Sequence, residues 1–187
     1  MFKLLMKTLT VLLTAGALTG LSSQTSSAAT VTPTWGHWGS LTITYHCASK
    51  SAYYRSIWQQ AVGQWNRTGV VRLRAVPTGQ KADIELTSAQ SITRAQVFAG
   101  YTDYSYYKRP HDNRIVFAKS ILDRGILTSY RYTKTQRVNV ATHELGHALG
   151  LSHSQDKRSV MNATNRYATI SAQDRIALRG AYAHQRA

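Results

Sequence analysis

Hydrophobic and polar residues alternate with a period of two in several short stretches of the chain. Residues 41–46 read Leu-Thr-Ile-Thr-Tyr-His, so every second side chain up to the tyrosine is a large apolar one. Three other short stretches are similar, at 70–76, 82–87 and 114–119, and residues 96–101 are predicted as one further strand. Because such alternation places one face of a strand against a core, the pattern predicts five strands.

Three longer stretches repeat their apolar residues at helical spacing instead. Residues 51–67 form the first, which Gly69 ends, and its apolar face consists of Tyr54, Trp58, Ala61 and Trp65. The second follows a loop at 131–135 and is largely apolar up to residue 149. The third begins at Ser171, and Asp174 three residues later gives the spacing of a capping box. Segments 31–40, 101–113 and 162–170 are predicted to be loops.

The order of these elements, without repeats or low-complexity linkers, predicts one compact α+β domain. The chain has 187 residues, which suits one domain better than two. Residues 1–28 are set apart: Lys3 and Lys7 precede an apolar run at 8–21, and small residues follow at 26–29. This arrangement is typical of a secretory signal peptide, and the run is short for a membrane span. We therefore expect a secreted protein whose single domain occupies residues 29–187.

The chain is strongly basic, with a formal net charge of +15 at pH 7. Loss of Lys3 and Lys7 with the signal peptide would leave about +13 (15 − 2). Such a charge favours association with anionic cell-wall polymers or lipid head groups. The arginines form no dense run and accompany no nucleic-acid-binding motif, so a specific nucleic-acid partner is not expected. The alternative is that the charge only keeps a secreted protein soluble.

Cys47 is the single cysteine, so the chain forms no intramolecular disulfide. Its position at the end of a predicted strand favours a small apolar packing role over a reactive one. We expect the fold to depend on its core and on a metal.

The stretch 143–153 reads His-Glu-Leu-Gly-His-Ala-Leu-Gly-Leu-Ser-His. On a helix His143 and His147 share a face, and Glu144 is placed to hold a water without binding the metal. Gly150 permits a backbone turn that can bring His153 back as a third ligand. Three neutral imidazoles with one open position are typical of catalytic zinc. The alternative, a polar surface helix, fits poorly with the apolar residues around the histidines.

This motif resembles the active-site segment of the matrixin branch of the metzincin zinc endopeptidases. The resemblance extends from about residue 38 to residue 182, and Ser159-Val160-Met161 falls at the spacing of the family's Met-turn. It implies a zincin-like fold: a twisted, mostly parallel five-stranded sheet with one antiparallel edge strand, an active-site helix and a C-terminal helix. Substrate would pair with the edge strand, here residues 97–101, by strand addition.

The resemblance also implies roles for individual residues. His143, His147 and His153 would bind one catalytic Zn²⁺, and Glu144 would be the general base for a zinc-activated water that hydrolyses a peptide bond. Met161 would form an apolar floor under the metal. The expected partners are protein or peptide substrates, and the expected state is a monomer.

The sequence departs from the family at positions that bear on specificity and on further metals. Asn162 and Ala163 follow Met161, where matrixins usually carry Tyr and Pro that shape the main specificity pocket. Asp103, His111 and Asp112 could be the remnant of a structural calcium site, although an ordinary polar loop explains them as well. Substrate preference therefore cannot be transferred from the family.

A function of another class remains open at this level. The protein could be a cationic cell-surface or matrix-binding module that uses zinc only structurally. A structural zinc usually has four protein ligands, and Ser154 and Asp156 are the only nearby donors. Chelation separates the two: an enzyme loses proteolysis with little unfolding, whereas the module collapses without ever showing activity.

Overall fold

The computed structural model describes residues 30–77, 79–92, 98–108 and 113–185. The predicted signal peptide, residues 1–28, lies outside these ranges, so its prediction stays untested. None of the helices in the described ranges combines the length and the apolar character that a membrane span requires.

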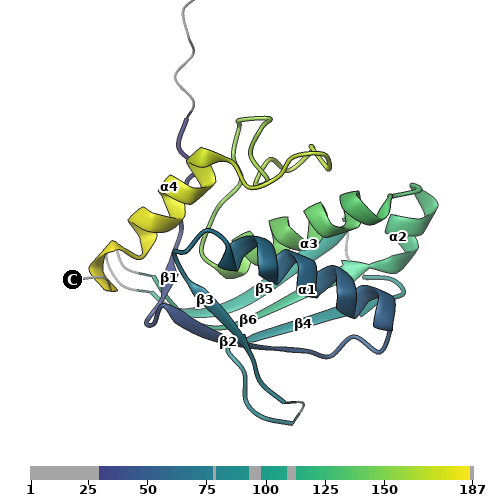
Figure 1. Ribbon diagram of the computed structural model, residues 1–187, viewed down its shortest axis with the longest axis horizontal. Coiled ribbons are helices and arrows are strands. Elements are labelled where there is room, and N and C mark those ends of the chain that lie inside the picture. Colours follow the sequence, from purple (N-terminus) through teal and green to yellow (C-terminus); the bar gives the residue numbers. More distant parts are fainter. Residues whose placement is uncertain (1–29, 78, 93–97, 109–112, 186–187) are drawn as a thin grey trace, which may run out of the picture.

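One sheet forms the base of the domain (Figure 1). Its strands are β1 (His37–Trp38), β2 (Thr42–Cys47), β3 (Arg72–Ala75), β4 (Ile84–Ala89), β5 (Gly100–Tyr107) and β6 (Arg114–Asp123). The order is β1-β6-β4-β2-β3, and these neighbours are parallel, whereas β5 runs antiparallel along β6. The predicted mostly parallel sheet with one antiparallel strand is confirmed, and the two-residue β1 adds a sixth strand to the predicted five.

The antiparallel strand extends much further than its sequence pattern indicated. Residues 101–113 were expected to form a polar loop, yet β5 continues to Tyr107 and pairs with β6 from Leu122 back to Arg114. Most of its side chains beyond Thr102 are exposed tyrosines and polar residues, so no buried face marks the strand in the sequence. Pairing of the β5 backbone with β6 supplies the missing stabilisation. The loop prediction was wrong for residues 101–107, and residues 96–97 lie outside the described ranges.

The short helix α2 (Arg124–Ser129) was not predicted. It begins where β6 ends, because the Asp123 carboxylate accepts a hydrogen bond from the amide of Ile126 at 2.8 Å. Six residues are too few for a helical repeat to appear in the sequence, so only this cap could have indicated the helix.

Two long helices, α1 (Ala52–Asn66) and α3 (Lys134–Ala148), pack together on one face of the sheet (Figure 1). The predicted apolar face of α1 is buried, and Trp58 and Trp65 are fully enclosed. The Trp65 indole nitrogen donates to the carbonyl of Thr142 at 2.9 Å, which fixes α1 against the metal-site helix. The two predicted helices are therefore confirmed, and their shared core holds α3 in place.

The last helix, α4 (Ala172–Ala181), ends in a short 3₁₀ turn, η1 (Ala183–Gln185). Its predicted capping box is confirmed: the Ser171 hydroxyl accepts from the Asp174 amide at 3.1 Å, and the Asp174 carboxylate accepts from the Ser171 amide at 2.8 Å. The phenol of Tyr182 donates to the carbonyl of Leu149 at 3.1 Å. The C-terminal helix is thereby tied to the end of α3.

Cys47 lies at the end of β2, as expected, and is half-buried. Burial raises the pKa of its thiol, so little thiolate forms near neutral pH. The packing role predicted for this residue agrees with its surroundings.

Candidate metal centre and cleft

Three histidines meet at one point of the cleft that runs between α3 and β5. The Nε2 atom of His147 lies 3.1 Å from the Nε2 atom of His143 and 3.1 Å from that of His153. Each of the three offers one nitrogen as a ligand atom, and these atoms all lie within 4.8 Å of one another, close enough to bind one metal ion. The sequence prediction that His153 returns to the first two histidines agrees with this arrangement.

The backbone after α3 explains how His153 comes back. Gly150 has a φ of +96°, in the left-handed region, and a Cβ there would lie 1.9 Å from the carbonyl oxygen of Gly36. The segment that contains Gly36 crosses the chain next to Gly150. There the Trp35 amide donates to the Gly150 carbonyl at 2.8 Å, and the Ser152 amide donates to the Pro33 carbonyl at 2.8 Å. Only glycine allows both the turn and the crossing.

Backbone carbonyls fix the tautomers of the two helical histidines. The Nδ1 atom of His143 lies 2.7 Å from the carbonyl oxygen of Val160, and that of His147 lies 2.9 Å from the carbonyl oxygen of Leu151. A carbonyl only accepts, so each Nδ1 carries the proton and each Nε2 presents its lone pair to the shared point. Burial lowers the pKa of His143 to about 4 and that of His147 to about 3, which keeps both rings neutral.

This donor set fits zinc. Lone pairs that converge on one point repel each other unless a cation lies between them. Zinc–nitrogen bonds of about 2.0–2.1 Å in tetrahedral geometry separate the nitrogens by roughly 3.3 Å, close to the spacing of the imidazoles here. Neutral imidazoles are ligands that zinc accepts readily, and a set of three leaves one position open.

Met161 lies directly beneath the metal-site helix and is fully buried. A Cβ on Gly146 would lie 2.3 Å from its sulfur atom, so the missing side chain at Gly146 creates the room for it. The carbonyl of Met161 accepts from the Ser154 amide at 2.9 Å, which joins this turn to the segment carrying His153. The position agrees with the apolar floor that the resemblance implied.

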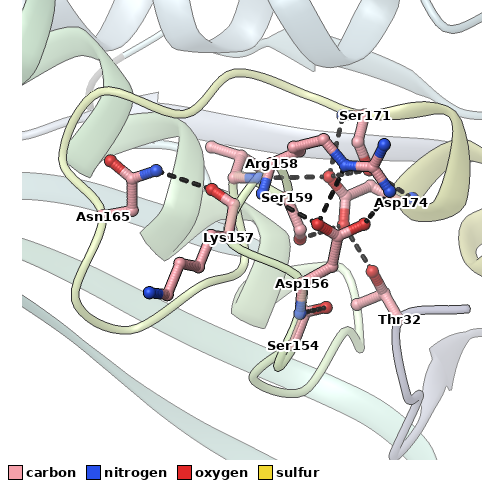
Figure 2. A network of polar contacts seen from close by, with 10 residues as sticks. Thr32, Ser154, Asp156, Lys157, Arg158, Ser159, Asn165, Ser171 and Asp174 are labelled. Atoms are coloured by element: carbon pink, nitrogen blue, oxygen red, sulfur yellow. Dashed lines mark hydrogen bonds and ion pairs between the residues drawn. The ribbon is translucent and has the colours of Figure 1, made fainter. Parts of the chain in front are cut away.

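Asp174 anchors the turn that carries Met161 (Figure 2). The carboxylate is completely buried and accepts from the Ser159 hydroxyl at 2.5 Å, the Val160 amide at 3.1 Å and the Thr32 hydroxyl at 2.5 Å. Since the Val160 carbonyl holds the His143 ring, α4 reaches the metal site through this network. The sequence indicated Asp174 only as a helix cap. Its other partners, Ser159 and Thr32, are 15 and 142 positions away in the chain, and such contacts leave no local pattern.

Glu144 is buried beside the histidines and contacts β5. The Thr102 hydroxyl lies 2.8 Å from its Oε2 atom, and the Ser120 hydroxyl lies 2.9 Å from the Thr102 hydroxyl. Burial raises the pKa of Glu144 to about 8, while the hydrogen bond from Thr102 acts to lower it. A neighbouring cation would favour the ionised carboxylate. The sequence motif predicted Glu144 but gave no signal for Thr102 or Ser120.

The site lies in a cleft of about 660 Å³. Among the residues that line it, Trp35 stacks on Tyr104, with 4.0 Å between ring centroids, and Arg166 lies over the ring of Tyr132, 4.5 Å from its centroid. Along one side the cleft follows β5, an edge strand of the sheet, and Asn162 and Ala163 also line it. The sequence indicated none of these four aromatic and cationic residues as part of the site.

Of the residues considered for a calcium site, only Asp103 lies in the described part of the chain. Asp103 belongs to β5, and the phenol of Tyr101 lies 3.3 Å from its carboxylate. His111 and Asp112 lie outside the described residues, so the possible calcium site stays untested. Asp156 instead binds the guanidinium of Arg158 at 3.0 Å, and among the described residues the group around the three histidines includes no fourth His, Cys, Asp or Glu.

Comparison with known proteins agrees with this arrangement. The sequence profile of the family described as Matrixin matches residues 37–183, which include every strand and helix of the described domain. No curated protein matches the sequence. Since the match covers most of the chain, the protein belongs to the matrixin family of zinc-dependent metallopeptidases.

Proposed function

We propose that the protein is a secreted zinc endopeptidase that uses His143, His147 and His153 as zinc ligands and Glu144 as general base. The observation that carries this proposal is the convergence of three Nε2 atoms beside a buried carboxylate, in a cleft bordered by an edge strand. The family shows a zinc-dependent peptidase in general; the assignment of each residue is the proposal.

Zinc bound by these imidazoles would lower the pKa of a water to about 7 and polarise the carbonyl of the scissile peptide bond. The Glu144 carboxylate would accept the proton of the attacking water and then deliver it to the leaving amine. The Val160 and Leu151 carbonyls would hold the first two rings in the ligating tautomer throughout. The buried position of Glu144 limits competing proton exchange with bulk water.

An extended substrate would add to the sheet at β5. This strand pairs with β6 along one side, and its other side borders the cleft. An edge strand can bind the main chain of a substrate without regard to its side chains. Selectivity would then come from side chains that line the cleft, among them Trp35, Tyr104, Tyr132 and Arg166.

The destination and surroundings of the enzyme are part of the same proposal. Residues 1–28 would be removed on secretion, leaving a monomeric domain of residues 29–187 that acts on proteins or peptides. Its positive charge would favour an anionic cell wall or membrane surface. Sequencing the N-terminus of the protein recovered from culture medium tests the first part: an intact Met1 would contradict it.

Glu144→Ala tests the chemistry. We expect this variant to bind zinc and to unfold like the unsubstituted protein, but to cleave a peptide library at least ~100-fold more slowly, as loss of a general base predicts. The measurements are zinc content, thermal unfolding and cleavage rates by mass spectrometry. Unchanged rates would remove Glu144 from the mechanism. If the unsubstituted protein cleaves nothing and chelation collapses its fold, the structural-zinc module would be the better description.

A further inference from the structure

We propose that Thr102 is a positioning residue for Glu144, and that Ser120 supports it from the neighbouring strand. The proposal rests on the function proposed above. Thr102 lies on β5 and Ser120 lies opposite it on β6, in the register that joins the two strands. Their hydroxyls and the Glu144 carboxylate form a buried chain between the sheet and α3.

The directions of these hydrogen bonds follow from counting protons. A carboxylate only accepts, whereas a hydroxyl donates once. The Thr102 hydroxyl faces the Glu144 carboxylate oxygen Oε2 at 2.8 Å and the Glu144 carbonyl oxygen at 3.0 Å. When a cation beside Glu144 keeps the carboxylate ionised, the charged acceptor at the shorter distance takes the proton, since such bonds are the stronger ones. Ser120 therefore donates to Thr102 across the 2.9 Å contact.

This assignment gives the two oxygens of Glu144 different tasks. Oε2 is held by Thr102, so the carboxylate cannot rotate freely. The other oxygen, Oε1, faces Gly100, where an added Cβ would lie only 2.8 Å away. Gly100 and Thr102 are two positions apart and so share one face of the strand. One residue fixes the carboxylate and the other leaves space beside the oxygen that would meet the water.

The same strand would also hold the substrate. If an extended peptide pairs with the cleft side of β5, its scissile carbonyl and the Glu144 carboxylate are both placed relative to one rigid backbone. Catalysis is sensitive to displacements of about 1 Å between reacting groups, so this shared reference affects the chemical step rather than substrate affinity. The role assigned to Thr102 is thus one of orientation.

Thr102→Val removes the hydroxyl but keeps the side-chain volume, and Thr102→Ser keeps the hydroxyl. We expect the valine variant to lower kcat by ~10- to 100-fold with KM and zinc content unchanged, as for other residues that orient groups beside a metal. The serine variant should retain kcat within about 3-fold, and Ser120→Ala should fall between the two. Ser105→Ala, which changes an exposed hydroxyl on the same strand, is the matched control and should match the unsubstituted protein.

Several results would overturn the role. If Thr102→Val keeps its kcat, or if serine and valine lower kcat equally, the hydroxyl does not orient Glu144. If valine unfolds the protein, Ser120→Ala becomes the test, and an unchanged kcat in that variant would refute the chain of donors. Failure of the proposed function looks different, because the unsubstituted protein itself would then cleave no peptide.

Discussion

At the scale of single residues, Gly146 determines how closely Met161 approaches the metal site. It lies one position before His147 on α3, and its missing side chain is replaced by the sulfur of Met161 and by the ring of Trp65. The predicted apolar floor therefore depends on a helical glycine, which the helix itself disfavours by about 1 kcal/mol relative to alanine. Packing outweighs that propensity here.

Gly146→Ala should therefore destabilise the protein, although alanine is the better helix former. The new Cβ would lie 2.3 Å from the Met161 sulfur and 3.1 Å from the Trp65 ring. Forced repacking of this kind costs about 1–3 kcal/mol. Gly180→Ala on α4 is the control, because nothing lies within 4 Å of its added Cβ, and it should stabilise by about 0.5–1 kcal/mol. Urea denaturation measures both, and equal effects of the two changes would contradict the packing argument.

The sequence indicated the candidate site residues that a local spacing relates to one another, and it missed those that contact them across the fold. His143, Glu144, His147 and His153 lie within one short stretch, where helix geometry and one glycine relate them. Thr102 reaches Glu144 from 42 positions away in the chain. Only the pairing of β5 with β6 and the packing of α3 on both bring them together, and no alternation of hydrophobic residues encodes that contact.

At the scale of elements, strands and helices with a buried face were predicted well. β2, β4 and α1 each place apolar residues in the core at the expected period. β5 was misjudged because an edge strand beside a cleft needs no apolar face, and its exposed tyrosines resemble a polar loop. The element that would bind substrate is thus the one with the weakest hydrophobic signal.

Asp174→Asn tests how α4 supports the metal centre. The Asp174 carboxylate accepts hydrogen bonds from hydroxyl and backbone amide groups, and the asparagine side chain would place an NH₂ donor against some of these donors. Each buried donor left unsatisfied costs on the order of 1–3 kcal/mol. We expect a marked loss of stability and weaker zinc binding, because a displaced Val160 carbonyl no longer holds the His143 ring.

The matched control for that change is Asp156→Asn. Asp156 precedes the same turn but pairs with the exposed guanidinium of Arg158. Exposed pairs contribute little to stability, so this change should have only a small effect. The measurements are zinc affinity by competition with a chelating dye and the free energy of unfolding. If Asp174→Asn leaves zinc affinity unchanged, α4 does not act on the site through Val160.

At the scale of the whole molecule, the buried ionisable groups of the site set how stability depends on pH. In metal-free protein, the pKa values of His143 and His147 lie at about 4 and 3, below their ordinary 6.5. The unfolded chain therefore binds these protons first, and the free energy of unfolding falls as the pH drops below 6.5. The pKa of Glu144 lies at about 8, above its ordinary 4.5, so the folded chain retains a proton that the unfolded chain releases. The stabilisation that Glu144 contributes to the folded state is therefore lost as the pH rises towards 8.

His143 and His147, together with His153, whose pKa burial also lowers, outweigh one carboxyl group between pH 4.5 and 6.5. Well above pH 6.5 the carboxyl group dominates, so metal-free protein should be most stable near pH 6.5. Urea denaturation of chelator-treated protein across this range measures the profile. Glu144→Gln has no group to titrate and should lose the alkaline decline while keeping the acidic one. Zinc should also remove the alkaline decline, because a cation favours the ionised carboxylate. If the free energy of unfolding of metal-free Glu144→Gln still declines above pH 6.5, a group other than Glu144 governs stability in that range.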